Sequence, residues 1–498
     1  MGFKMGNKTF WNKKIECAPL EELIKLQNRK LRESRVIERA YKSPLYSRIW
    51  KKHDIRSEDI KKREDLKKLP FITGKDLKKA ILNGKIEDII CTQNVRLWFS
   101  TSGTTGTPKW IPYSDEEIKT FEESVMRTFY VYAAELLKKY RHLKALMIST
   151  PAPFVSDGLV YFNLFADVLN DVQLENIVVS FSTGSEGLQL ASARKLHCML
   201  GFPSIAMKTA ELIEEKVPEM IKNEFKRRKT LKNLVAFLFS KLKRITPKLL
   251  FKPIIGVYGG EPLDPYRKAI IDSYGLEPFE LYAFTEFPCI HPECNVHNGI
   301  HIWIDFCICE IIPVEELDKE EEKPGYTPRT VFLDEAEPGL EGELVITTFG
   351  EALPLVRYRT SDLVRVVDTK PCRCGRTHPR VKILQRRDDL VNLGLIRFSS
   401  FELDKKLSRV SKYGLVKKWQ LHIQRKGYKP KPLLLVEAED VKDRNKFISE
   451  IREKIAEIEV LEKGIEEGLV LDVEIKIVDQ IKEKRTHTGK LRHVIYED

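Results

Sequence analysis

Strand-like and helical segments alternate through the middle of the chain, from about Trp98 to Arg386. Apolar runs typical of strands occur at 143–150, 253–260 and 342–348, with helical patterns between them. This alternation predicts an α/β fold with mixed sheets. The first 95 residues carry helical patterns with faces rich in Lys and Glu, so we predict that they are mostly helical.

The last part of the chain has a different pattern. Strand-like segments at 417–427 and 431–440 are followed by a helical segment from about Asp443 and an alternating segment at 471–479. With 498 residues the chain exceeds the roughly 250–300 residues at which single cores stop growing. We therefore predict two domains, a large one over 1–386 and a small α+β one over 387–498.

Composition and charge narrow the class of protein. Hydrophobic residues make up 42% and charged residues 32% of the chain, and apolar runs such as 234–239 are far shorter than the roughly 18 residues of a membrane span. The first ten residues contain no apolar signal region, so we expect a cytoplasmic protein without a membrane span. The net charge of +12 suits an anionic ligand, but spread over this length it does not predict nucleic-acid binding.

Two charged segments allow more than one interpretation. The segment 224–244 has apolar residues at helical spacing among many cations, which fits a surface helix with its apolar stripe on the core. A basic amphipathic helix on a membrane surface is the alternative; we expect the first arrangement. We interpret the Glu-rich segment 315–323 as a solvated loop.

A loop rich in Gly, Ser and Thr is the strongest functional feature. Its glycines let the backbone come close to a ligand, and its hydroxyls, amides and terminal Lys suit phosphate oxygens. The spacing is not that of the Walker motif, so composition alone leaves a plain surface loop as an alternative. The residues are Ser100, Thr101, Ser102, Gly103, Thr104, Thr105, Gly106, Thr107, Pro108 and Lys109.

The order of residues in this loop, STSGTTGTPK, resembles the phosphate loop of the acyl-adenylate-forming enzymes. Further motifs resemble that superfamily in the same order: YGGEPL at 258–263, LYAFTEF at 281–287, LVRYRTSDL at 355–363 and THTGKLR at 486–492. Within the superfamily, SPLYSRIW at 43–50, LPFITGKDL at 69–77 and CRCGRTHPR at 372–380 resemble the phenylacetate–CoA ligase branch. The resemblance implies a large adenylation domain, a small mobile C-terminal domain, and ATP-dependent conversion of a carboxylic acid to acyl-AMP followed by transfer to CoA.

The resemblance also implies roles for single residues. Lys109 would neutralise the phosphates, Glu286 would bind Mg²⁺, and Lys490 would stabilise the charge that develops at the α-phosphate. Asp362 would accept the ribose hydroxyls, and Asp388, or its neighbour Asp389, would be the hinge. Further nucleotide contacts are expected from Gly259, Gly260, Glu261, Tyr282, Ala283, Phe284, Thr285 and Arg386, with Arg387 as an alternative to Arg386.

The acceptor and the acid are less constrained than the adenylation step. The segment 390–400 has no Asn or Pro at the places where the ligases carry them after the hinge, so a protein thiol or an amine remains an alternative to CoA. An aryl or arylacetic acid is the substrate that the resemblance suggests. A non-catalytic nucleotide-binding protein is disfavoured because Glu286 and Lys490 are both present, and a homodimer is one possible assembly.

Cysteine and histidine residues suggest a metal site. Two Cys and three His lie within 289–301, and a Cys-x-Cys pair follows at 372–374. Tetrahedral Zn²⁺ takes such ligands from two loops, and nine cysteines in a cytoplasmic chain favour metal over disulfides. Resemblance to zinc-carrying relatives assigns Cys294, His301, Cys372 and Cys374 as ligands, with Cys289, His291 and His297 as substitutes. Unligated buried thiols are the alternative; we expect any zinc to be structural.

Overall fold

The computed structural model describes residues 3–5, 8–83, 85–100, 109–140, 143–149, 174–180, 196–250, 253–323, 325–386, 390–481 and 493–497. Three parts of the predicted site lie outside these ranges. They are the loop residues Thr101, Ser102, Gly103, Thr104, Thr105 and Gly106, the hinge candidate Asp388 with its neighbours, and Lys490. Their roles stay predictions.

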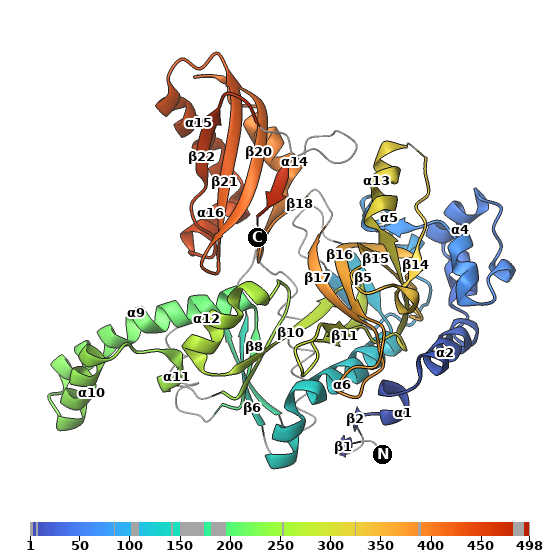
Figure 1. Ribbon diagram of the computed structural model, residues 1–498, viewed down its shortest axis with the longest axis horizontal. Coiled ribbons are helices and arrows are strands. Elements are labelled where there is room, and N and C mark those ends of the chain that lie inside the picture. Colours follow the sequence, from blue (N-terminus) through green and yellow to red (C-terminus); the bar gives the residue numbers. More distant parts are fainter. Residues whose placement is uncertain are drawn as a thin grey trace.

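The N-terminal residues form short helices that pack on a seven-stranded sheet (Figure 1). In α2, Leu23, Gln27 and Leu31 are buried at a spacing of four residues, so one face of the helix contacts the core. Gln27 Nε2 donates to the carbonyl of Ile304 at 2.8 Å, which fixes α2 against the sheet. The helices are α1 Lys13–Glu16, α2 Leu20–Glu33, α3 Val36–Lys42, α4 Pro44–Lys51 and α5 Gly74–Leu82, with the strands β1 Phe3–Met5 and β2 Lys8–Trp11 before them.

The seven-stranded sheet has the order β12-β17-β16-β15-β13-β14, and the short strand β3 pairs with the first residues of β16 outside this order. All its pairs are antiparallel except β3 with β16. The strands are β3 Ile72–Thr73, β12 Ile300–His301, β13 Cys307–Pro313, β14 Val331–Phe332, β15 Glu341–Thr348, β16 Tyr358–Asp368 and β17 Arg380–Arg386.

A second sheet has six strands in the order β11-β10-β9-β8-β6-β7. Its strands run parallel except for β11, which forms a hairpin with β10. Parallel and antiparallel pairs together confirm the predicted α/β class with mixed sheets. The strands are β6 Leu143–Ser149, β7 Leu174–Ser180, β8 Cys198–Gly201, β9 Ile255–Tyr258, β10 Glu277–Phe284 and β11 Phe287–Pro292, and the neighbouring helices are α6 Asp115–Lys139, α9 Pro203–Arg227, α11 Pro247–Leu250 and α12 Asp264–Tyr274.

The C-terminal part forms a four-stranded sheet, β22-β21-β20-β23, drawn in orange and red at the top of Figure 1. Asp443 caps α15 by accepting from the amides of Asn445 and Lys446, and Ile451 and Ile455 face the sheet. A domain boundary near residue 387 stays a prediction. The elements are β18 Leu390–Leu393, β19 Ile396–Ser399, α14 Ser400–Leu407, β20 Leu415–Lys426, β21 Lys429–Glu439, α15 Arg444–Ala456, α16 Glu459–Glu466, β22 Glu474–Val478 and β23 Val494–Tyr496.

Two predictions about charged segments are wrong. The segment 315–323 is not a loop but most of helix α13, Val314–Glu322, in which Leu317 is buried and Lys319 pairs with Glu316 at 2.7 Å. Good helix formers and this pair one turn apart outweigh the high charge. The segment 224–244 forms the end of α9 and helix α10, Leu231–Leu242, but α10 buries none of its residues. Its apolar stripe therefore does not face the core.

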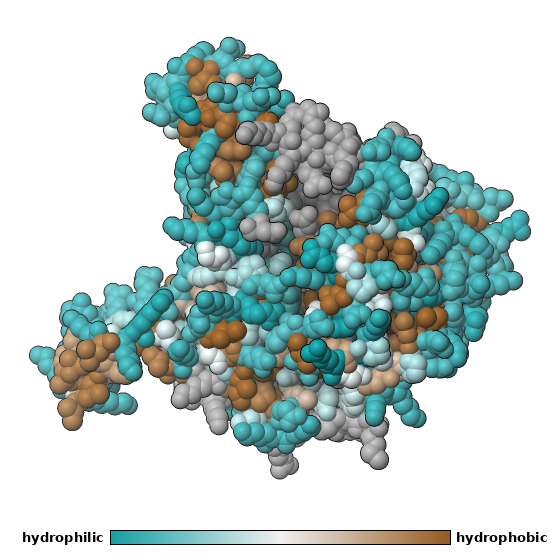
Figure 2. All heavy atoms as spheres, viewed as in Figure 1, coloured by the Kyte–Doolittle hydropathy of each residue, from teal (hydrophilic) through white to brown (hydrophobic). Residues whose placement is uncertain are grey.

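Among the described residues, no helix combines the length and the apolar character needed to cross a membrane. Helices α9 and α10 instead project from the body as an arm, with an apolar patch at its end (Figures 1 and 2).

Candidate active site and metal centre

A short hairpin holds the two ends of the Gly/Ser/Thr loop together. Strand β4, Leu97–Ser100, precedes the loop and pairs antiparallel with β5, Trp110–Tyr113, which follows it. Lys109 is the last residue before β5, so the hairpin positions it beside the loop. Trp98 and Trp110 on this hairpin are 37% and 43% exposed.

Lys109, Glu286 and Tyr358 form a buried cluster next to this loop. Glu286 lies in the turn between β10 and β11, and its carboxylate accepts hydrogen bonds from Lys109 Nζ and, at 2.8 Å, from Tyr358 Oη. The Lys109 Nζ to Tyr358 Oη distance is 3.3 Å. A buried carboxylate needs such partners because it has lost its water. The structure thus brings two of the predicted catalytic residues together.

Sequence reasoning missed Tyr358 and Gly74 at this cluster. Tyr358 lies inside the 355–363 motif, and its hydroxyl bridges the two charged groups. Gly74 begins α5, and a Cβ there would lie 3.2 Å from Lys109 Nζ and 3.4 Å from Tyr358 Oη. The absent side chain leaves room for the cluster. Both residues lie in the motifs at 355–363 and 69–77, which were the available signal.

Asp362 and Tyr282 meet across the two sheets. Tyr282 in β10 donates its hydroxyl hydrogen to Asp362 Oδ2 at 2.6 Å, and both side chains are buried. Arg386 stands opposite Asp362 in the β16–β17 ladder. Three residues predicted to contact the nucleotide therefore occupy neighbouring strands.

The Gly-Gly-Glu turn after β9 requires both of its glycines. Gly260 has a φ of 82°, and a Cβ on it would lie 2.4 Å from the ring of Phe202. A Cβ on Gly259 would lie 2.4 Å from the side chain of Leu281. Close packing requires a glycine at both positions, and their predicted contacts with the nucleotide stay predictions.

Glu261 and Thr285 have structural contacts of their own. Glu261 Oε1 accepts from the backbone amide of Ser204 at 2.8 Å, so its carboxylate faces the start of α9, and burial raises its pKa. The Thr285 carbonyl accepts from Tyr113 Oη at 2.8 Å, which ties the β10–β11 turn to β5. Ala283 and Phe284 are the last two residues of β10 and lead into this turn.

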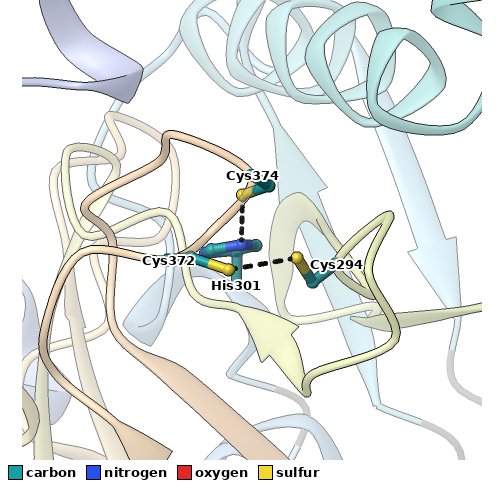
Figure 3. A group of neighbouring side chains, drawn as sticks. All are labelled: Cys294, His301, Cys372 and Cys374. Atoms are coloured by element: carbon teal, nitrogen blue, oxygen red, sulfur yellow. Dashed lines mark hydrogen bonds between the residues drawn. The ribbon is translucent and has the colours of Figure 1, made fainter.

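The predicted metal ligands gather at one point (Figure 3). The ligand atoms of Cys294, His301, Cys372 and Cys374 all lie within 4.8 Å of one another. Cys294 Sγ is 3.3 Å from Cys372 Sγ, and Cys374 Sγ is 3.3 Å from His301 Nε2. Two Zn–S bonds of about 2.3 Å at a tetrahedral angle would place their sulfurs about 3.8 Å apart, so the set fits this ion after a small adjustment.

Hydrogen bonds prepare this group for metal binding. His301 Nδ1–H donates to the carbonyl of His378 at 3.1 Å, which leaves Nε2 to face the thiols. Hydrogen bonds from Cys294 and His301 lower the pKa of the Cys374 thiol. A thiolate is the form that binds a metal.

The alternative ligands are occupied elsewhere. His297 bonds Glu293 at 3.0 Å and Glu277 at 3.1 Å, and His291 Nδ1 accepts from the amide of Trp303 at 3.2 Å. Burial lowers the pKa of His291 to about 3, so it stays neutral. Cys289 is buried in the core beside His291. The four residues assigned from the resemblance are therefore the ones whose ligand atoms lie together, and their role as metal ligands stays a prediction.

The two clusters share their supporting strands. Glu286 precedes β11 and Cys294 follows it, while Tyr358 begins β16 and Cys372 lies beyond its end. Cys294 follows a strand of the six-stranded sheet, whereas His301 lies in β12 of the seven-stranded sheet, so the predicted metal ligands come from both sheets.

The chain is similar to a known protein family and to characterised ligases. The GH3 family N-terminal domain matches residues 42–223, and the GH3 family central domain matches residues 300–386. The chain is similar to the phenylacetate–coenzyme A ligase of Thermus thermophilus, with 25% identity over 97% of this chain and 98% of the relative.

Solved structures show the same fold. The chain resembles 2-hydroxyisobutyryl-CoA ligase, solved with 2-HIB-AMP and CoA, at a TM-score of 0.70 and 19% identity, covering 99% of this chain and 94% of that one. It also resembles the GH3.15 acyl acid amido synthetase solved with 2,4-DB, at a TM-score of 0.54 and 18% identity over 95% and 90% of the two chains.

Proposed function

Because the chain belongs to the GH3-family adenylate-forming enzymes related to phenylacetate–CoA ligases, we propose that it activates a carboxylic acid with ATP and passes the acyl group to CoA. The first step joins the acid to the α-phosphate and releases pyrophosphate. The second forms the thioester and releases AMP.

End-to-end similarity to a phenylacetate–CoA ligase carries this proposal. The match extends over 97% of the chain, so it includes the segments with the loop, the Glu286 turn and the Asp362 strand. The buried cluster of Lys109, Glu286 and Tyr358 supports it, because adenylation brings two anions together and needs opposing charge.

The contacts within this cluster are ones that ATP and Mg²⁺ would replace on binding. Lys109 and Glu286 neutralise each other without a ligand. With ATP bound, Lys109 would turn to the phosphate oxygens, and Glu286 would be the oxygen ligand for Mg²⁺, which supplies charge neutralisation between the phosphates. Tyr358 would keep the carboxylate oriented during the exchange.

The remaining residues would position the rest of the reactants. Asp362, oriented by the Tyr282 hydroxyl at 2.6 Å, would accept the ribose hydroxyls beside Arg386. Lys490 would reach the α-phosphate from the C-terminal domain, 387–498, by rotation about Asp388. An aryl or arylacetic acid would bind near the end of β10.

The Cys294, His301, Cys372 and Cys374 group would hold a structural zinc ion. Three thiols and one imidazole match the ligands that tetrahedral Zn²⁺ prefers. Four protein ligands leave no open position, so zinc would fix the loops and take no part in the chemistry.

Amide formation is the second candidate. The similarity to an acyl acid amido synthetase and the GH3 family matches favour it. Both candidates share the adenylation step and differ in the acceptor, a thiol or an amine.

Pyrophosphate release from a library of carboxylic acids, with and without CoA, tests the proposal. We expect one class of acid to support release, and CoA to yield a thioester identified by mass spectrometry. Lys490→Ala should abolish acid-dependent release. The proposal fails if no acid supports release; amines that replace CoA as acceptor would establish the second candidate.

A further inference from the structure

The outer face of α10 is apolar and exposed. Leu231 and Leu242 at its two ends are 77% and 84% exposed, and the residues between them form one continuous patch at the tip of the arm (Figure 2). The other members are Leu234, Val235, Leu238 and Phe239. Water contact with so many large apolar side chains is unfavourable, which marks a surface that binds something.

The opposite face of α10 is already used. Phe237 stacks on Phe225 of α9 with ring centroids 5.2 Å apart, and Arg244 pairs with Glu214 at the base of the arm. The Thr230 hydroxyl caps α10 by accepting from the amide of Asn233 at 3.2 Å. The helix is therefore held on α9 with its apolar face outward.

Cations surround the exposed face. The segment 226–244 contains eight Lys or Arg residues and no Asp or Glu. At roughly 3.6 residues per turn, Lys232 and Lys241 fall on either side of the apolar face, and Lys243 follows the helix. These three lysines are exposed and form no ion pair within the described part of the chain.

We propose that α10 docks in the plane of a membrane whose surface carries anionic phospholipids. Such a surface offers acyl chains for the leucines and phosphate or carboxylate groups for the lysines. A second copy of the chain fits less well, because pairing the same faces would bring two sets of eight cations together. Nucleic acid would satisfy the cations but leave the leucines in water.

The docking would be peripheral. Helix α10 has 12 residues, which is too short to cross a bilayer. No residue of α10 belongs to the Lys109, Glu286 and Tyr358 cluster or to the predicted nucleotide contacts, and the helix lies on an arm that projects from the body (Figure 1). The proposal therefore does not depend on the proposed function.

Vesicle flotation of the full chain tests the proposal. The chain should float with vesicles of phosphatidylcholine and phosphatidylserine, float little with phosphatidylcholine alone, and dissociate as salt is raised. The variant Leu231→Ser/Leu242→Ser should weaken binding by roughly tenfold or more. Lys232→Gln/Lys241→Gln/Lys243→Gln should weaken it by about fivefold for each removed charge.

Matched controls separate docking from misfolding. Two control variants change exposed residues outside α10: Lys51→Gln/Lys52→Gln and Leu415→Ser. Both variants should float with the vesicles to the same extent as the unmodified chain. All variants should keep the same melting temperature. Absence of flotation, or equal flotation of the α10 variants, overturns the proposal. A dimer that Leu231→Ser/Leu242→Ser dissociates, without vesicle binding, would overturn it in favour of a second copy.

Discussion

Glu286 and Cys294 lie at opposite ends of β11, and Tyr358 and Cys372 lie at opposite ends of the β16 segment. At the Glu286 end, the strands are held by the Lys109–Glu286 ion pair and by the hydrogen bond from the Tyr358 hydroxyl, and substrate groups would replace these contacts. At the Cys294 end, three thiols and one imidazole converge within 4.8 Å of one another. The contacts at the Glu286 end can be exchanged for substrate, as the expected chemistry requires. The contacts at the Cys294 end would stay in place and hold the strands in position.

The largest expected effect is at the exchangeable end. Glu286→Gln removes the negative charge that Lys109 faces and that Mg²⁺ would need, so acid-dependent pyrophosphate release should fall about 10²–10³-fold. Initial rates at saturating ATP measure this. Glu337→Gln, an exposed carboxylate elsewhere, is the control and should leave the rate unchanged. A fall of less than threefold, roughly, would remove Glu286 from the site.

The second effect should appear at the fixed end as stability. Cys372→Ser/Cys374→Ser, or chelation, should remove the metal and lower the melting temperature by roughly 5–10 °C. Release activity at moderate temperature should change far less than in Glu286→Gln.

Another Cys-x-Cys pair provides the control for metal loss. Cys307 and Cys309 are buried with sulfurs 3.4 Å apart, outside the four-residue group. Cys307→Ala/Cys309→Ala should lose stability through packing but keep the metal, as elemental analysis would show. Equal metal content in both double variants would contradict the assignment.

A smaller effect is expected where a single hydroxyl orients a carboxylate. Tyr282→Phe removes the 2.6 Å bond to Asp362, and the KM for ATP should rise about 5–10-fold, equivalent to about 1 kcal/mol. Tyr46→Phe loses a similar bond to the carbonyl of Pro354 and should reduce stability without changing KM. If both variants change KM equally, the role of Tyr282 is structural.

The smallest effect is expected for a change at Gly74, where the KM for ATP and the melting temperature should respond differently. Gly74→Ala places a methyl group near Lys109 Nζ, so the KM for ATP should rise about twofold, whereas helix propensity should keep or raise the melting temperature. Lys75→Ala in the same helix controls for propensity. A KM for ATP that falls in Gly74→Ala would contradict this prediction, because it would show that the added methyl group does not crowd Lys109.

The hydrophobic patterns in the sequence predicted several strands and one helix of the fold correctly. Strands β6, β9 and β15 and helix α15 lie where alternation and helical spacing place them. The pairing of Lys109 with Glu286, across 177 residues, required the resemblance, because no local pattern joins residues so far apart.

Other features depend on contacts that a pattern does not contain. Spacing left Cys289, His291 and His297 as possible ligands, and only their tertiary hydrogen bonds exclude the two histidines. The stripe of α10 has the periodicity of a buried face, yet whether a partner element covers it is decided by the rest of the fold. The prediction failed there because periodicity reports which residues share a face, not what the face contacts.

The hairpin that supports the Gly/Ser/Thr loop also has an optical consequence. Of the six tryptophans, Trp50 and Trp303 are fully buried, Trp419 is 3% exposed and Trp11 is half-buried, whereas Trp98 and Trp110 are the most exposed and lie on either side of the loop. Quenching of fluorescence by iodide would therefore act mainly on the two indoles at the loop's base. Native emission could follow nucleotide entry in real time, without a label and without turnover.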